Sequence, residues 1–222
     1  FDKPMALASS LPEGYFSPDW LLKLLLPAIK EGRQWGSRFL RDPRWGGDRD
    51  RMAKHAIYEA TLWSVGSGVA TGVIGLAGVP LDVAYFYHAQ VKLAAALFTI
   101  HGLDTEDQAV LMILIPAALG VTAAELANYF GNQFCRQVFK TLSRRAAQKN
   151  LSPVLISVFK QLPRPLLRQI VGKASSKSST LPARAVPLMS AVIGGTTNAI
   201  MMNICGHGVC AVIKTFRSPA VN

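Results

Sequence analysis

The chain has 222 residues, a length that suits one domain with its own core and excludes dependence on disulfides or a metal ion for folding. Hydrophobic residues make up 50% of the chain and charged residues only 17%, so part of it is expected to be hidden from water or to lie near lipid. Residues 1–125 carry 11 basic and all 13 acidic residues, whereas residues 126–222 carry 13 basic and no acidic ones, so the net charge of +11 resides in the second half.

The first predicted helix begins at Ser17 and Pro18, because serine is a favoured N-cap and proline suits the first helical turn. Turn-forming residues at 42–48 predict a loop, and the next helix is expected from about residue 50. We therefore expect residues 1–49 to form an N-terminal helical extension and residues 50–217 to form the main domain. Since the chain begins with Phe1 rather than Met, we also expect an N-terminal piece to be missing or processed.

Two long segments are uncharged and rich in small residues. Residues 63–81 and 185–213 contain no charged side chain, and small residues recur in both at a spacing of four. This spacing lets helix backbones approach closely and favours packing inside a bundle, although a run of this length also leaves a membrane span open. We expect the two segments to pack against each other. The glycines expected to mediate this packing are Gly68, Gly72, Gly75, Gly194 and Gly195.

Two further helices are predicted between these segments, at residues 81–100 and 108–124. Gly102 suits a left-handed cap at the end of the first, and Thr105 with Gln108 predicts a capping box at the start of the second. Pro116 predicts a kink. Because the connections are short, these helices are expected to pack as antiparallel neighbours.

Residues 128–149 and a segment beginning at Ser152 predict two basic amphipathic helices, each with an apolar stripe opposite Lys and Arg side chains. With no carboxylate nearby, they are expected to present a positive field to an anionic partner; the alternative is a face that only keeps the protein soluble. The residues expected to bind an anionic surface are Arg136, Lys140, Arg144, Arg145, Lys149, Lys160, Arg164, Arg168, Lys173 and Lys177.

A few polar residues lie in otherwise apolar segments. Asp82 is the only acidic residue between Glu59 and Asp104, and it is interpreted first as a helix N-cap favoured by the helix dipole. The alternative is a polar centre shared with other helices, for which His88 and Lys92 lie one turn apart. The candidates for this centre are Asp82, His88, Gln90, Lys92 and Asn198.

Motifs that carry catalysis are absent. The sequence has no GxSxG, no HExxH and no P-loop lysine, so no catalytic residue, metal ion or cofactor is expected. Cys135, Cys205 and Cys210 form no CxxC pair and have no histidine at a zinc-like spacing. They are interpreted as reduced thiols, mostly buried, in a reducing compartment.

Two stretches resemble the bacterial EcsC family. The first comprises residues 75–82, which lead through 89–92 to 101–104, and the second comprises residues 186–198. In that family a glycine-rich helix leads to an aspartate, here Asp82, and a proline with spaced glycines leads to an asparagine, here Asn198. Ser190 and His101 depart from the family's glycine and tyrosine. The resemblance implies a helical fold and association with bacterial membranes, and it implies no catalytic residues.

These observations favour an all-α protein, a compact helical bundle with closely packed apolar helices. The leading hypothesis is a non-enzymatic, membrane-associated protein whose basic second half binds anionic lipid, located in the cytoplasm on or partly inserted in the inner face of the membrane. A membrane protein complex is a further expected partner, and nucleic acid is not expected. Two alternatives stay open: a lipid-binding or lipid-processing protein with an apolar cavity, and a soluble module for an acidic protein partner.

Overall fold

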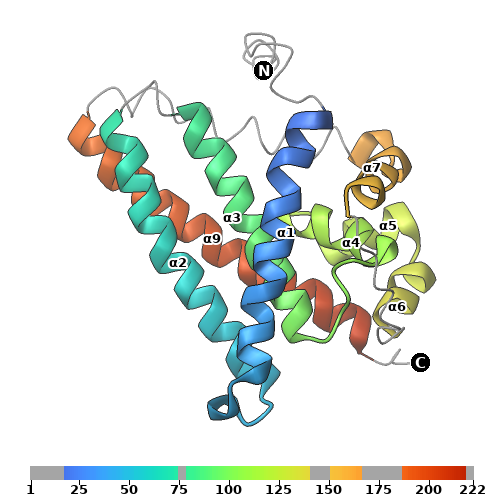
Figure 1. Cartoon of the computed structure of the whole chain (residues 1–222). Helices are drawn as coiled ribbons and strands as arrows, with labels where there is room; N and C mark the ends of the chain where they lie inside the picture. The colour runs from blue at the N-terminus through green and yellow to red at the C-terminus, as the bar shows by residue number, and fades with distance from the viewer. Residues whose placement is uncertain (1–17, 75–78, 141–150, 167–186, 219–222) are drawn as a thin grey trace.

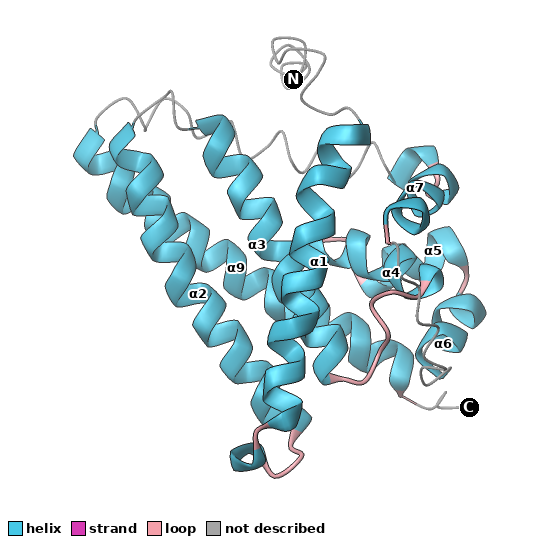
Figure 2. Ribbon diagram, in the orientation of Figure 1, coloured by secondary structure: helices cyan, strands magenta, loops and turns pink. Residues whose placement is uncertain are grey.

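The computed structural model describes residues 18–74, 79–140, 151–166 and 187–218. Every regular element in these ranges is helical and none is a strand, as Figures 1 and 2 show, which confirms the all-α prediction. The elements are α1 (Pro18–Arg41), the 3-10 helix η3 (Pro43–Trp45), α2 (Arg49–Ile74), α3 (Val79–Ile100), α4 (Gln108–Ala118), α5 (Ala123–Phe130), α6 (Asn132–Lys140), α7 (Ser152–Gln161) and α9 (Pro187–Arg217).

Helix α3 lies at the centre of the bundle, where it contacts α1, α2, α4 and α9. Every residue from Leu93 to Phe98 is fully buried. A stretch of helix enclosed on all sides needs no polar face, so its apolar residues follow no single stripe. This explains why the segment is apolar around its whole circumference.

Helix α1 packs along α3 through small residues that the sequence analysis did not single out. Ala28, Gly32 and Gly36 recur every four residues on α1 and are buried. A Cβ added to Gly36 would lie 2.6 Å from the carbonyl oxygen of Ala96 and 2.9 Å from the Cβ of Thr99. The two backbones therefore lie so close together that only glycine fits.

The first helix shares its core with the rest of the chain. Leu25 and Ile29 of α1 belong to the same buried cluster as Phe98 of α3 and Leu114 of α4. The predicted boundary after residue 49 falls at the start of α2. One buried cluster therefore contains residues from both sides of that boundary, so α1 is part of the same core as the helices that follow it.

Helices α2 and α9 run antiparallel and pack along each other (Figure 1). Near one end Lys214 of α9 forms an ion pair of 3.3 Å with Asp50 of α2, and further along Ile57 of α2 covers Gly206 of α9. The two helices that contain the uncharged segments therefore pack against each other, as expected. Gly68, Gly72, Gly194 and Gly195 lie in α2 and α9 where surroundings are not described, and Gly75 lies outside the described residues.

Two local predictions near α4 have different outcomes. Gly102 adopts a φ of 79° after α3, as a left-handed cap requires. The capping box at Thr105 and Gln108 is wrong, because α4 begins one residue after Asp107, whose carboxylate accepts hydrogen bonds from the N–H groups of Ala109 and Val110. Aspartate competes well for an N-cap, and Thr105 is buried instead.

The predicted helix at residues 128–149 is divided in the structure. Helix α5 ends at Phe130 and α6 begins at Asn132, with Gly131 at a φ of 82° between them. Only glycine adopts this conformation readily, so the chain changes direction there. Thr122 and Glu125 form a capping box at the start of α5.

Candidate functional site

The uncharged segments of three helices meet at one end of the molecule. The C-terminal part of α2 and the N-terminal part of α9 lie together at the upper left of Figure 1, and the N-terminal part of α3 lies at the same end of the molecule. We call residues 63–74, 79–85 and 187–200 the apolar tip. Asp82 is its one charged residue by sequence. Helix α3 begins at Val79, so Asp82 lies in the first turn rather than at the N-cap, and the surroundings of its side chain are not described.

Exposed aromatic residues lie where the apolar tip joins the charged body. Trp63 of α2 is 79% exposed and Tyr85 of α3 is 56% exposed. Beyond them toward the body lie charged residues, among them Glu59 and Lys92. We call Trp63 and Tyr85 the aromatic collar.

The outer side of the α2 and α9 pair is also apolar near the collar. Leu62 of α2 is 53% exposed, and Ile200 and Ile204 of α9 are 55% and 61% exposed. Because the helices are antiparallel with Ile57 against Gly206, Leu62 and Ile200 fall at the same level. Large aliphatic side chains exposed in a group are typical of a surface that meets a partner or lipid.

Two of the expected polar-centre residues meet a third that was not expected. Lys92 of α3 forms an ion pair of 2.8 Å with Oε2 of Glu31 on α1, and Nε2 of His88 lies 3.4 Å from the same oxygen. The Nδ1 of His88 lies 3.3 Å from the carbonyl oxygen of Leu24. The hydrogen bond from Lys92 holds the pKa of Glu31 below its ordinary value, so this carboxylate stays ionised.

The remaining expected members of the polar centre lie elsewhere. Gln90 is buried on α3, and its Oε1 has no hydrogen-bond partner within the described part of the chain. Asn198 of α9 is 1% exposed and does have a partner. The structure therefore brings His88 and Lys92 together at Glu31, and among the described residues neither Gln90 nor Asn198 forms a hydrogen bond with that carboxylate.

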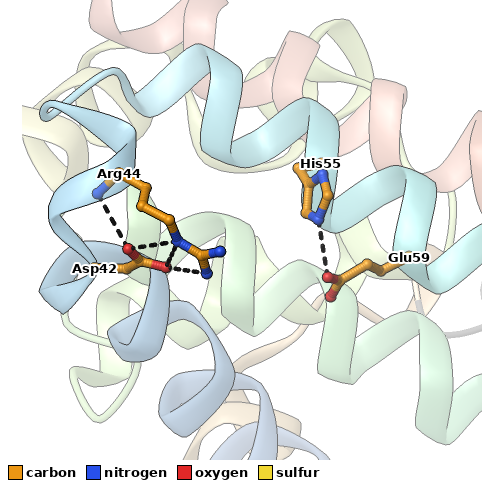
Figure 3. Close-up of polar contacts among 4 residues, drawn as sticks. All are labelled: Asp42, Arg44, His55 and Glu59. Atoms are coloured by element: carbon orange, nitrogen blue, oxygen red, sulfur yellow. Dashed lines mark hydrogen bonds and ion pairs between the residues drawn. The ribbon is translucent and has the colours of Figure 1, made fainter.

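A second carboxylate is fixed on the neighbouring helix. Glu59 of α2 accepts a hydrogen bond of 3.2 Å from the indole N–H of Trp35 on α1, and its other oxygen lies 3.0 Å from Nε2 of His55 (Figure 3). Figure 3 also shows Arg44 bound to Asp42 in the connection between α1 and α2. Glu59 is thereby held from both sides at the edge of a pocket.

The pocket lies between α1, α2 and α3 and has a volume of about 670 Å³. Glu31, Glu59, Lys92 and His88 line it together with aromatic side chains that include Trp35 and Trp63. Sequence reasoning missed Glu31, Trp35, Glu59 and Trp63. A signal was present, because α1 and α2 each carry a Glu followed by a Trp four residues later, which places both on one face.

The expected anion-binding residues divide into three groups. Arg136 of α6 donates a 2.7 Å hydrogen bond to the carbonyl oxygen of Ser218, so it is engaged within the protein. Lys140, Lys160 and Arg164 are exposed and form no side-chain ion pair with another described residue. The other six lie outside the described residues: Arg144, Arg145, Lys149, Arg168, Lys173 and Lys177.

The three cysteines are free, and Cys135 and Cys205 are buried, as the sequence predicted. Burial raises the pKa of Cys205 to about 12 and that of Cys135 to about 11, so both thiols stay protonated and unreactive near neutral pH. Within the described ranges no three His, Cys, Asp or Glu side chains gather where a metal ion would bind.

One helix in the described part of the chain is long and apolar enough to cross a membrane, Thr196–Arg217. In the most apolar window of this helix, 39% is buried inside the protein. Core helices of soluble proteins can be equally long and apolar, so length and composition alone do not identify a membrane span. Comparisons with protein-family models, with curated proteins and with solved structures find no match to the chain.

Proposed function

We propose that the chain is a non-enzymatic, membrane-associated protein that inserts its apolar tip into one leaflet and holds basic residues against anionic headgroups. The aromatic collar is the observation that carries this proposal. Trp and Tyr concentrate at bilayer interfaces, where the ring is in an apolar layer and the N–H or O–H reaches water. Here Trp63 and Tyr85 occupy the boundary between an uncharged end and a charged body.

The length of the tip favours insertion into one leaflet over crossing the bilayer. From Trp63 to its end at Ile74, α2 rises about 16 Å at about 1.5 Å per residue. The hydrocarbon core of a bilayer is about 30 Å thick, so the tip reaches about halfway. In this arrangement the charged body of the bundle stays in water.

Basic residues on α7 support an anionic target. Helix α7 contacts α1 and α4, and in Figure 1 it lies at the end of the bundle where α1 begins. Lys160 at the end of α7 and Arg164 just after it are exposed. Each basic residue near an anionic leaflet contributes on the order of 1 kcal/mol to binding. Anionic lipid is abundant on the cytoplasmic leaflet, which makes that face the proposed location.

The first test is flotation of the full chain with liposomes of phosphatidylcholine, with and without phosphatidylglycerol. We expect flotation with the anionic liposomes, only partial release by high salt, and complete release by detergent. Failure to float with either liposome contradicts the proposal. Salt-sensitive capture of an acidic protein without any lipid dependence would instead favour a soluble interaction module.

The second test asks whether the aromatic collar contacts the hydrocarbon region of the bilayer. Quenching of tryptophan fluorescence by lipids brominated along the acyl chain reports contact with the hydrocarbon region. We expect Trp63→Phe to remove most of this quenching. Trp45→Phe is the matched control, because Trp45 lies in η3 at the opposite end of α2. Equal quenching in the wild type and the Trp63 variant contradicts insertion of the tip.

The EcsC resemblance is compatible with this proposal, since it implies a helical protein at a bacterial membrane. Membership of that family is itself a proposal. It adds no residue to those named above.

A further inference from the structure

The pocket between α1, α2 and α3 begins at the aromatic collar and extends into the charged body. Trp63 and Tyr85 belong both to the collar and to the pocket wall. Buried Phe86 and Met202 contribute apolar surface to the same wall. The volume of about 670 Å³ falls within the range of roughly 300 to 1,000 Å³ that small-molecule sites occupy.

The charges of the pocket balance. Two carboxylates, Glu31 and Glu59, face two permanent cations, Arg38 and Lys92, in its lining. Glu31 uses Oε2 for both Lys92 and His88, and no hydrogen bond or ion pair joins its Oε1 to another described residue. The guanidinium of Arg38 likewise forms no ion pair within the described ranges. A ligand that carries one positive and one negative group would complement this lining.

The lining of the pocket changes from aromatic residues at the end near the apolar tip to charged residues farther into the body. Trp63 on α2 and Tyr85 on α3 lie toward the apolar tip, while Arg38 lies near the C-terminal end of α1, toward the opposite end of the bundle. An amphiphile bound here would point its apolar part toward the tip and its charged part toward the body. This is the direction of a lipid in the leaflet that the tip is proposed to enter.

We propose that the pocket binds the headgroup of one zwitterionic phospholipid. The carboxylates of Glu31 and Glu59, with the ring of Trp35, receive the ammonium group, because aromatic faces and carboxylates both attract cations. Arg38 receives the phosphate, since a guanidinium group donates charge-assisted hydrogen bonds to phosphate oxygens, while Lys92 stays paired with Glu31. The acyl chains leave past Trp63 and Tyr85 along the tip. This deepens the proposed membrane function by assigning a lipid class to a single site, distinct from the basic surface.

The test uses lipid monomers, so that its result does not depend on membrane association. The full chain is titrated with dihexanoyl-phosphatidylcholine and dihexanoyl-phosphatidylethanolamine below their micelle concentrations, with dihexanoyl-phosphatidylglycerol as the anionic comparison. We expect saturable binding of the two zwitterionic lipids, about ten-fold tighter than the anionic one, by calorimetry and tryptophan fluorescence. Absence of saturable binding, or equal affinity for all three, overturns the proposal whether or not the chain floats with liposomes.

Glycerophosphocholine, which lacks acyl chains, separates a lipid from a soluble phosphodiester. We expect it to compete for the same site with lower affinity, and equal or higher affinity would overturn the assignment to a lipid. Arg38→Gln tests the phosphate contact against Arg41→Gln on the same helix, whose guanidinium binds the carbonyl oxygen of Ser37 outside the pocket. We expect about a ten-fold loss of zwitterionic lipid affinity for Arg38→Gln and less than two-fold for Arg41→Gln. An equal effect of the two substitutions contradicts the site.

Discussion

Gly32 of α1 lies directly against the backbone carbonyl of Lys92 on α3, with no room for a side chain between the helices. The residue before it, Glu31, forms the 2.8 Å ion pair with the side chain of the same Lys92. The close helix contact and the polar cluster are therefore neighbours in sequence and in space. The glycine sets the distance between the helices that lets Glu31 reach Lys92 and His88.

Replacement of Gly32 by alanine is expected to destabilise the fold. A Cβ there would lie 2.7 Å from the Cβ of Ala95 as well as against the Lys92 carbonyl, so the helices must separate. Overpacking of this kind costs roughly 1 to 3 kcal/mol. The measurement is the free energy of unfolding from chemical denaturation.

Gly208→Ala is the matched control on α9, because an added Cβ there meets nothing within 4 Å. Alanine is favoured over glycine inside a helix by about 1 kcal/mol, so this variant is expected to be as stable as the wild type or more stable. If Gly32→Ala and Gly208→Ala have the same effect on stability, the described contact between α1 and α3 is incorrect.

His101 at the end of α3 is expected to make stability depend on pH. Burial, aided by the nearby charge of Arg217, lowers its pKa from 6.5 to about 4, against an opposing effect of Asp50. The folded state therefore favours the neutral imidazole. The contribution of His101 to stability is fully present above pH 6.5, where the unfolded state is also neutral, and it is lost as the pH falls toward 4 and the unfolded state binds a proton. The loss is on the order of 2 to 3 kcal/mol.

Denaturation curves measured between pH 7 and pH 4 check this prediction, and NMR titration of the imidazole gives its pKa directly. His101→Gln keeps a polar side chain of similar size without a charge change in this range. It is expected to remove most of the pH dependence between these limits. An imidazole that titrates near 6.5 in the folded protein would contradict the prediction.

Charge reversal on α7 is expected to weaken binding to anionic membranes. Lys160→Glu combined with Arg164→Glu replaces two exposed cations at the end of the bundle where α1 begins. With about 1 kcal/mol per basic residue, binding to phosphatidylglycerol liposomes should fall by at least ten-fold. Sedimentation with liposomes of graded anionic content measures the change.

Lys140→Glu changes an exposed cation on α6, which lies away from that end of the molecule in Figure 1. Lys140→Glu should reduce binding much less than Lys160→Glu alone or Arg164→Glu alone. An equal reduction for all three would mean that net charge alone governs binding, which contradicts the proposed orientation.

Asp82→Asn is expected to strengthen insertion of the tip. Asp82 is the one charged residue in the apolar tip, and a charged aspartate costs about 2.5 to 3.5 kcal/mol at the centre of a bilayer and less near its surface. Removing the charge should raise partitioning into liposomes several-fold. The control is Asp50→Asn, which removes a carboxylate at the opposite end of α2. Unchanged partitioning of Asp82→Asn would place this residue outside the lipid.

The sequence predicted the all-α fold because helical periodicity and the choice of residues at helix ends are local properties. It located the uncharged segments, the left-handed cap at Gly102 and the pairing of α2 with α9. It was wrong about the cap of α4, because Thr105 and Asp107 both suit an N-cap and only the packing of Thr105 into the core decides between them.

Tertiary structure decided which residues join His88 and Lys92 in the candidate site. Glu31 and Trp35 precede Lys92 by more than fifty residues, and no local pattern indicates that α1 packs against α3 at Gly32 and Gly36. The sequence established what kind of surfaces exist: uncharged helix ends and a basic second half. Which of them meet depends on how close the helix backbones approach, and that distance follows from contacts between residues far apart in the chain.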